Sequence, residues 1–222
     1  QQPEYEIISL GQMGGPVSGG QAVSSNGTFG AGFNDDDPFL WEAGGDVIPL
    51  NSLPGRPFSI HWSVNDTGTI AGIGATTFFG SNALPVIWKN GEAIQLALPP
   101  GEALGRAYGI NKSELGVGSI DGGTAERAAT FSESGPGMQI TATMPGGGIL
   151  RTAYAVNNSS RIVGQATDPS NAAVTKGFYI DDGDSEATDI GAIAALGHNS
   201  AIAFDVSNAG FITGSSSFNS GV

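Results

Sequence analysis

The chain has 222 residues, among them 36 glycines and no cysteine, and its formal net charge is −13. Eight Lys and Arg residues against 21 Asp and Glu residues disfavour a phosphate-binding groove or an anionic membrane surface, so we expect no nucleic acid partner. No run approaches the ~20 apolar residues that cross a bilayer, and the lack of cysteine excludes disulfides and thiolate metal sites.

The N-terminal region carries one predicted strand. The chain begins at Gln1 without Met and without a basic or apolar leader, which favours a mature, exported protein at the cell surface or outside the cell. A trimmed chain is the alternative. Residues 5–10 alternate in a way that predicts a strand, and this strand resembles the last strand of each unit described below.

A short pattern then returns five times along the chain. Each copy has a large residue, a small residue, Val or Ile, and a polar turn of Asn, Ser and Gly before an apolar strand. The Val or Ile positions are Val23, Val64, Ile110, Val156 and Val206, at spacings of 41, 46, 46 and 50 residues. Periods in the forties built of short strands are typical of propeller blades. The sequence therefore predicts an all-β fold, a β-propeller of five blades with four antiparallel strands each.

The second unit shows the four strands most clearly. They are expected at Ile60–Asn65, Thr69–Ile73, Pro85–Trp88 and Ala93–Leu96, with Asn90-Gly91 as a tight hairpin turn. We expect one domain over residues 1–222, with units at about 21–50, 60–96, 106–140, 152–190 and 202–222.

In four of the five units the first strand carries an aromatic residue two positions before the Val or Ile. Strict alternation would place both on one face, against the small residues of the neighbouring unit. We therefore interpret the aromatic residues as core, and a sugar-binding platform is the alternative. They are Trp62, Tyr108, Tyr154 and Phe204. Five Asn-x-Ser/Thr sequons fall on the turns that follow, where Asn and Ser favour the turn itself.

These strings resemble the HAF repeats, a family of extracellular repeats. The matching segments are Ser63–Gly72, Ala153–Gly164, Phe204–Gly214, Phe39–Trp41 and the connector Leu10–Gly15. The resemblance covers nearly the whole chain, but its motifs are short and structural. It implies an exported or surface-attached protein and implies no particular biochemical activity.

The fifth unit is expected to be incomplete. It supplies strands at Ile202–Val206 and Phe211–Ser215, and we expect the N-terminal strand at residues 5–10 to complete it as the fourth strand. The third strand is missing, and two explanations stay open: the sequence stops short of its natural end, or another copy inserts a strand. The second explanation predicts a homo-oligomer or filament. Its strand-exchange candidates are Tyr5, Ile7, Ile8 and Phe218.

Carboxylates are the main candidates for chemistry. Two acidic loops offer dense oxygen ligands of the kind that suit calcium, with solvated turns as the alternative. The calcium candidates are Asp35, Asp36 and Asp37 in one loop, and Asp182 and Asp184 in another. In a propeller these loops lie at opposite ends, so they cannot form one site. We expect no other cofactor.

Catalytic groups are scarce. His61 and His198 lie on different units, and we expect His61 to be a packed, hydrogen-bonded core residue. Asp205 is the single acid in an inner-strand position, whereas a glycosidase needs two carboxylates facing each other. We expect a non-enzymatic exported protein acting as a structural or adhesive subunit. The alternative is a monomeric carbohydrate-binding propeller, with Phe78 and Phe79 on its ligand face.

Overall fold

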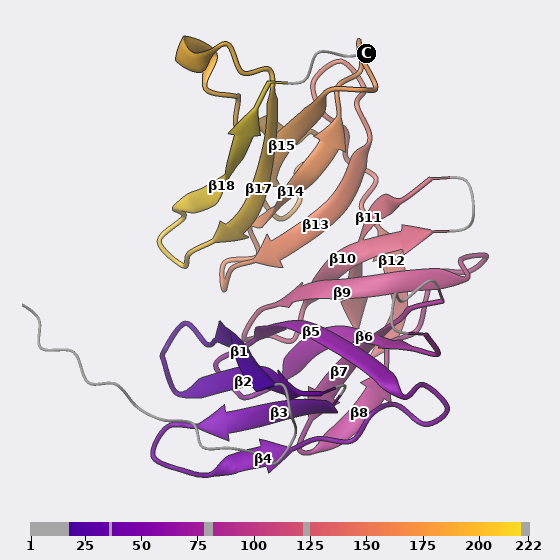
Figure 1. Ribbon diagram of the computed structural model, residues 1–222. Coiled ribbons are helices and arrows are strands. Elements are labelled where there is room, and N and C mark those ends of the chain that lie inside the picture. Colours follow the sequence, from indigo (N-terminus) through magenta and orange to yellow (C-terminus); the bar gives the residue numbers. More distant parts are fainter. Residues whose placement is uncertain (1–17, 36, 78–81, 122–124, 219–222) are drawn as a thin grey trace, which may run out of the picture.

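The computed structural model describes residues 18–35, 37–77, 82–121 and 125–218. These residues form four antiparallel sheets of four strands and one sheet of two strands, which follow one another in chain order (Figure 1). In every four-stranded sheet the strands are also adjacent in chain order. The all-β prediction is confirmed, and the arrangement is of the propeller type.

The first two sheets lie close to their expected positions. The second sheet begins at Phe58 and ends at Gln95, within about two residues of the expected unit. The strands of these sheets are β1 (Ser18–Val23), β2 (Phe29–Asn34), β3 (Asp37–Glu42), β4 (Val47–Pro49), β5 (Phe58–Val64), β6 (Ile70–Ala75), β7 (Leu84–Lys89) and β8 (Glu92–Gln95).

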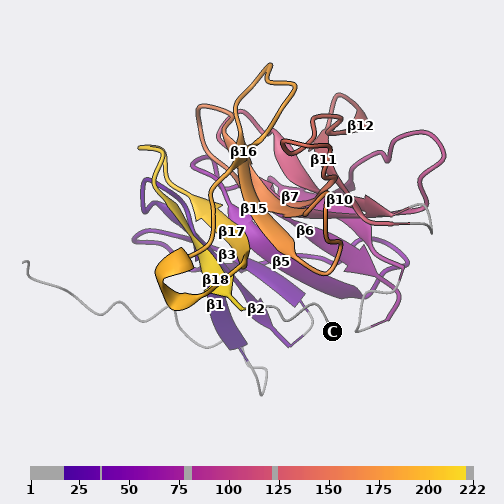
Figure 2. The same ribbon diagram turned by 90° about the horizontal axis from the view of Figure 1, so that it is seen from above.

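The later sheets repeat this order, and the fifth contains two strands. A short 3₁₀ helix, η1 (Ala194–Leu196), precedes the fifth sheet and lies on the outside of the molecule (Figure 2). The strands are β9 (Leu104–Ile110), β10 (Gly116–Asp121), β11 (Arg127–Ser132), β12 (Gly135–Gln139), β13 (Leu150–Val156), β14 (Ile162–Thr167), β15 (Thr175–Ile180), β16 (Thr188–Asp189), β17 (Ser200–Val206) and β18 (Ile212–Ser217). Within the part of the chain that the structure describes, no helix is long and apolar enough to span a bilayer.

A β-bulge recurs in the innermost strand of every sheet. In β5 the register passes from His61 directly to Ser63, so Trp62 is an extra residue without a partner opposite it. The same shift occurs in β1, β9, β13 and β17. The extra residues are Gln21, Trp62, Tyr108, Tyr154 and Phe204, the positions at which the repeat carries its large residue. A bulge bends the strand and redirects the side chain at that point.

The bulge also explains why the aromatic residue and the Val or Ile do not share one buried face, as strict alternation predicted. One extra residue reverses the alternation, so Ala107 and Ile110 share a face and belong to one buried cluster. Ala153 and Val156 do the same in the fourth sheet. In the second to fifth sheets the Val or Ile is therefore core, as expected. None of the four aromatic residues belongs to the buried clusters of the described chain, because the bulge directs them away from the sheet interfaces.

A glycine lies opposite the bulge in the second strand of every sheet. A Cβ atom on Gly72 would collide with the carbonyl oxygen of Ile60, and one on Gly164 with that of Thr152. The equivalent positions are Gly32, Gly118 and Gly214, and each faces the same obstacle. Close approach of a neighbouring backbone is a standard reason for glycine inside a strand. The bulge and the glycine therefore form one structural unit.

Apolar clusters join successive sheets, and the cluster at the fifth sheet is the smallest. The cluster between the third and fourth sheets contains eleven buried residues, including Val117 and Phe178. The cluster between the fourth and fifth sheets contains three, Val163, Ala203 and Val206. Because each buried Val or Phe contributes ~1.5–3 kcal/mol, the fifth sheet is held far less firmly than the others.

Asparagine side chains connect the turns of neighbouring sheets. The Asn65 amide donates a hydrogen bond to the carbonyl of Asn111 at 2.9 Å, Asn111 donates to Asn157 at 3.1 Å, and Asn157 donates to Ser207 at 3.1 Å. The Oδ1 atom of each Asn accepts backbone N–H groups of its own turn. This supports turn chemistry as the reason for these three sequons. The first and last turns carry Ser24 and Ser207, which have no amide to donate.

Candidate functional site

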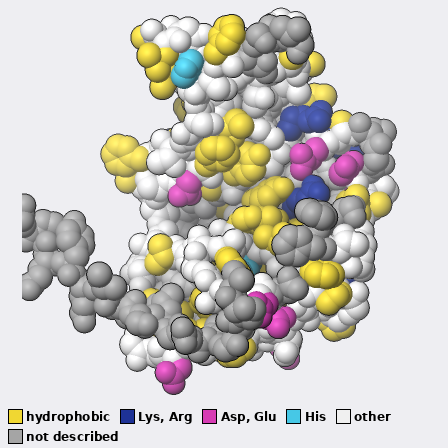
Figure 3. All heavy atoms as spheres, in the orientation of Figure 1, with side chains coloured by type: hydrophobic (Ala, Val, Ile, Leu, Met, Phe, Trp, Pro, Cys, Tyr) yellow, Lys and Arg dark blue, Asp and Glu magenta, His cyan; other side chains and the backbone are white. Residues whose placement is uncertain are grey.

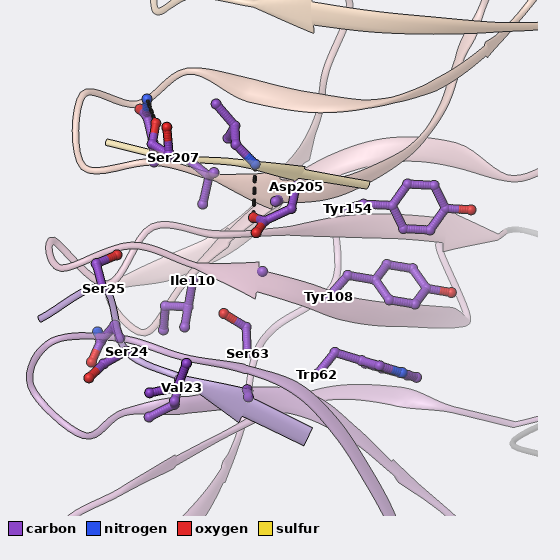
Figure 4. A pocket seen from close by; sticks show the side chains of 18 of the residues that line it. Val23, Ser24, Ser25, Trp62, Ser63, Tyr108, Ile110, Tyr154, Asp205 and Ser207 are labelled. Atoms are coloured by element: carbon purple, nitrogen blue, oxygen red, sulfur yellow. Dashed lines mark hydrogen bonds between the residues drawn. The ribbon is translucent and has the colours of Figure 1, made fainter. Parts of the chain in front are cut away.

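A central cavity of about 870 Å³ lies between the innermost strands of all five sheets. Its wall consists of β1, β5, β9, β13 and β17 together with the turns that follow them (Figure 4). The volume falls in the ~300–1,000 Å³ range of small-molecule sites. Among the residues that line it are two acids, Asp66 and Asp205, and no Lys, Arg or His. The cavity therefore disfavours anionic ligands.

The four bulge aromatics form a continuous row along this cavity, which we call the aromatic row. The ring centroids of Trp62 and Tyr108 are 4.6 Å apart, those of Tyr108 and Tyr154 are 5.4 Å apart, and those of Tyr154 and Phe204 are 5.5 Å apart. The first three rings lie above one another and point the same way (Figure 4). Hydrophobic side chains gather over β9 and β13 on this face (Figure 3). The expectation that these aromatic residues belong to the core is therefore wrong.

The tyrosines of the row stay protonated at physiological pH. Burial raises the pKa of Tyr108 to about 12, and burial also raises the pKa of Tyr154. Both side chains therefore present neutral hydroxyl groups, which can donate as well as accept hydrogen bonds.

Polar contacts join the turns that follow the inner strands, at one end of the cavity. Asp66 accepts a hydrogen bond from the backbone N–H of Asn26 at 2.9 Å through Oδ1. Its other oxygen accepts the side-chain amide of Asn158, 92 residues away, at 3.1 Å. The turns of the second and fourth sheets thus meet across the cavity. No motif in the sequence indicated this pair, because the contact depends on how the sheets are arranged around the cavity.

A second candidate surface is the outer edge of β18, which we call the open edge. Among the described residues β18 pairs only with β17, whereas the second strands of the other sheets pair on both sides. Phe211 and Phe218 flank it, with 76 % and 67 % of their surfaces exposed. At the other end of the stack Val23 is 68 % exposed, although its equivalents are only 5–8 % exposed. The first and fifth sheets therefore each present a surface that a neighbouring sheet covers elsewhere.

The predicted calcium ligands do not converge. Asp35 and Asp37 are exposed at the β2–β3 turn, and Asp182 and Asp184 are exposed at the β15–β16 turn, near the opposite end of the sheets. The described residues contain no group of three or more His, Cys, Asp or Glu side chains arranged to hold a metal. Other predicted residues lie outside the described residues, namely Tyr5, Ile7, Ile8, Asp36, Phe78 and Phe79.

His61 is buried but lacks the hydrogen bond that we expected. Only 1 % of its surface is exposed, and neither ring nitrogen has a hydrogen-bond partner among the described residues. Its ring meets that of Trp88 edge-on at 6.5 Å. Burial lowers the pKa of His61 to about 4, so the neutral imidazole packs as part of the core.

Comparisons with known proteins show the fold and go no further. No protein-family model matches the chain, and no curated protein does. Among solved structures, the chain is similar to one titled "The structure of putative TolB from Agrobacterium tumefaciens", with a TM-score of 0.52 and 11 % sequence identity. The match covers 78 % of this chain, which spans 61 % of that one. At this identity the likeness supports a propeller-type fold and carries no functional information.

Proposed function

We propose that this chain is a non-enzymatic, exported protein that serves as a structural or adhesive subunit of a cell-surface or extracellular assembly. In this proposal the five repeat units are blades of one propeller, and copies associate when a strand of one copy adds to the open edge of the next. The observation that carries the proposal is the six-residue edge of β18, which has no second partner strand in the described chain.

Main-chain pairing gives such an edge its affinity. In the fourth sheet all six residues of β14 pair with β15, from Ile162 opposite Ile180 to Thr167 opposite Thr175. The six residues of β18 occupy the equivalent position and present the same backbone donors and acceptors. An exposed edge of this kind is a template for strand addition.

The strand that we propose to be exchanged is formed by residues 5–10, which include Tyr5, Ile7 and Ile8. Seven residues separate this segment from β1, and eight separate β4 from β5 and β8 from β9. The spacing is therefore that of a fourth strand preceding an inner strand. Supplied to another copy, the same strand pairs directly with β18, in the place that the third strand takes in the other sheets, and so links two copies. Repetition of this contact produces a chain of copies.

Light scattering after size exclusion of residues 1–222 across a concentration series tests this proposal. We expect the mass to grow with concentration and expect Phe218→Lys to keep the protein monomeric. Met138→Lys is the matched control, because Met138 is also 67 % exposed but lies on the third sheet. A monomer at every concentration contradicts the proposal. Equal inhibition by both variants also contradicts it, since that result indicates nonspecific aggregation.

A further inference from the structure

We propose that the central cavity is a binding site for neutral carbohydrate, with the aromatic row as its stacking surface. The proposal is independent of assembly through the open edge. It rests on the chemistry of the cavity wall, which combines aromatic rings, uncharged hydrogen-bonding groups and the absence of any basic side chain among its lining residues.

The aromatic row lies outside the apolar core that packs between the sheets, although its rings contact one another from sheet to sheet. Its members lie outside the buried clusters of the described chain, and Phe204 is 48 % exposed. Aromatic residues at four of the five equivalent bulges direct large side chains into a cavity, where apolar surface without a ligand contacts water at a cost. Binding of an apolar face removes that cost. The axial C–H faces of neutral sugars supply such a face.

Hydrogen-bonding groups line the same cavity as the row. The wall includes the hydroxyls of Ser25 and Ser63 and the amide of Gln21. These groups donate and accept at once, which suits sugar hydroxyls. Gln21 takes the bulge position of the first sheet, so the row ends in an amide there. Phosphorylated, sulfated and carboxylated sugars are disfavoured, because no lining residue offers a positive charge to pair with them.

A cationic ligand fits this wall less well, although aromatic rings and carboxylates can bind cations. Both oxygens of Asp66 already accept hydrogen bonds, from Asn26 and from Asn158. Asp205 accepts the backbone N–H of Val206 at 2.8 Å and lies at the end of the row, beside Phe204. The Asp205 carboxylate alone, at one end of a cavity of about 870 Å³, provides little negative charge to attract a cation. The proposal therefore commits to an uncharged ligand.

The test begins with an array of neutral, sialylated and sulfated glycans probed with the protein of residues 1–222. The strongest neutral glycan is then titrated by calorimetry, with spermidine and choline as cationic competitors. We expect at least one neutral glycan to bind and expect Tyr154→Ala to weaken it about tenfold or more. Tyr179→Ala is the control, because Tyr179 is half-buried on β15 and is not among the residues lining the cavity.

A second variant keeps the proposal testable if Tyr154→Ala fails to fold. Phe204→Ser removes an exposed ring outside the core, so the fold should tolerate it, and we expect it also to weaken binding. The proposal is overturned if no neutral glycan binds, if only anionic glycans bind, or if spermidine or choline occupies the site instead. It is also overturned if binding survives both cavity variants unchanged. None of these results depends on whether the protein assembles, because the same titrations can be made with Phe218→Lys.

Discussion

The fourth and fifth sheets start from similar sequences and have different environments. Both begin with a bulged inner strand and a polar turn, and both continue into a second strand of six residues, β14 or β18. In β14, Val163 and Ala166 are buried beneath neighbouring sheets. In β18 the equivalent residues are Thr213 and Ser216, and the outer edge is unpaired among the described residues. Local sequence thus determines the hairpin, whereas the neighbouring sheets determine its burial.

The strongest test of this comparison uses the glycine opposite the bulge. A Cβ atom on Gly164 would collide with the Thr152 carbonyl, while β15 holds β14 in place on the other side. We expect Gly164→Ala to lower the free energy of unfolding by roughly 2–4 kcal/mol in urea titrations. Gly214→Ala meets the same obstacle at the Ile202 carbonyl, but β18 can move outward, so its loss should be at most half as large. Equal losses would contradict the comparison.

Low pH should lower the free energy of unfolding through His61, which lies in the second sheet. Its folded-state pKa of about 4 lies below the ordinary value of 6.5, so the unfolded chain binds the proton more readily. Stability is therefore fully present above pH 6.5 and is lost as the pH falls from 6.5 to 4, by about 3 kcal/mol. Urea titrations at several pH values measure this loss. His61→Ala, the residue found at the three later equivalents, should flatten the slope in this window, and an unchanged slope would show that another group is responsible.

The asparagine links predict a smaller effect between the fourth and fifth sheets. Asn157→Ser keeps a hydroxyl for the turn, as at Ser207, but removes the amide that donates to the Ser207 carbonyl. We expect a loss of ~1 kcal/mol and faster amide exchange in β17 than in β13. Ser207→Asn is the matched control, because it adds an amide at the equivalent turn position of the fifth sheet and leaves the link from Asn157 in place. An equal gain from this control would indicate that the turn, rather than the link, determines stability.

The smallest change in stability is expected from substitutions at Arg161 and Phe211, the residues that directly precede β14 and β18. Arg161 pairs with Asp181 at 2.7 Å and lies 4.4 Å from the Tyr179 ring centroid, whereas its equivalent, Phe211, is exposed. Arg161→Ala should lower the melting temperature only slightly, because the pair is partly solvated. Phe211→Ala should leave the unfolding free energy unchanged and reduce concentration-dependent assembly. If thermal melts show that Phe211→Ala is more destabilising than Arg161→Ala, the comparison is contradicted, because Phe211 must then be buried against other residues.

Much of the fold could be predicted from the sequence, because the repeat recurs at nearly constant spacing. Strands, hairpins and turn asparagines follow local rules of alternation and turn chemistry. The role of the aromatic residues could not be predicted by alternation, since one bulge reverses it. A combined signal was present, however: an aromatic residue in the first strand always accompanies a glycine at the fixed position in the second. The contact between Asp66 and Asn158 left no local signal, because it depends on the arrangement of distant sheets.

Hydrogen–deuterium exchange of β18 and β14, measured at low and high protein concentration, tests the central claim most directly. The open edge predicts rapid exchange of the outward-facing β18 amides in dilute protein and their protection as the particles grow. The β14 amides should be protected under both conditions, because β14 pairs on both sides. The account is contradicted if the β18 amides are already protected in dilute protein, or if particles grow while those amides still exchange freely.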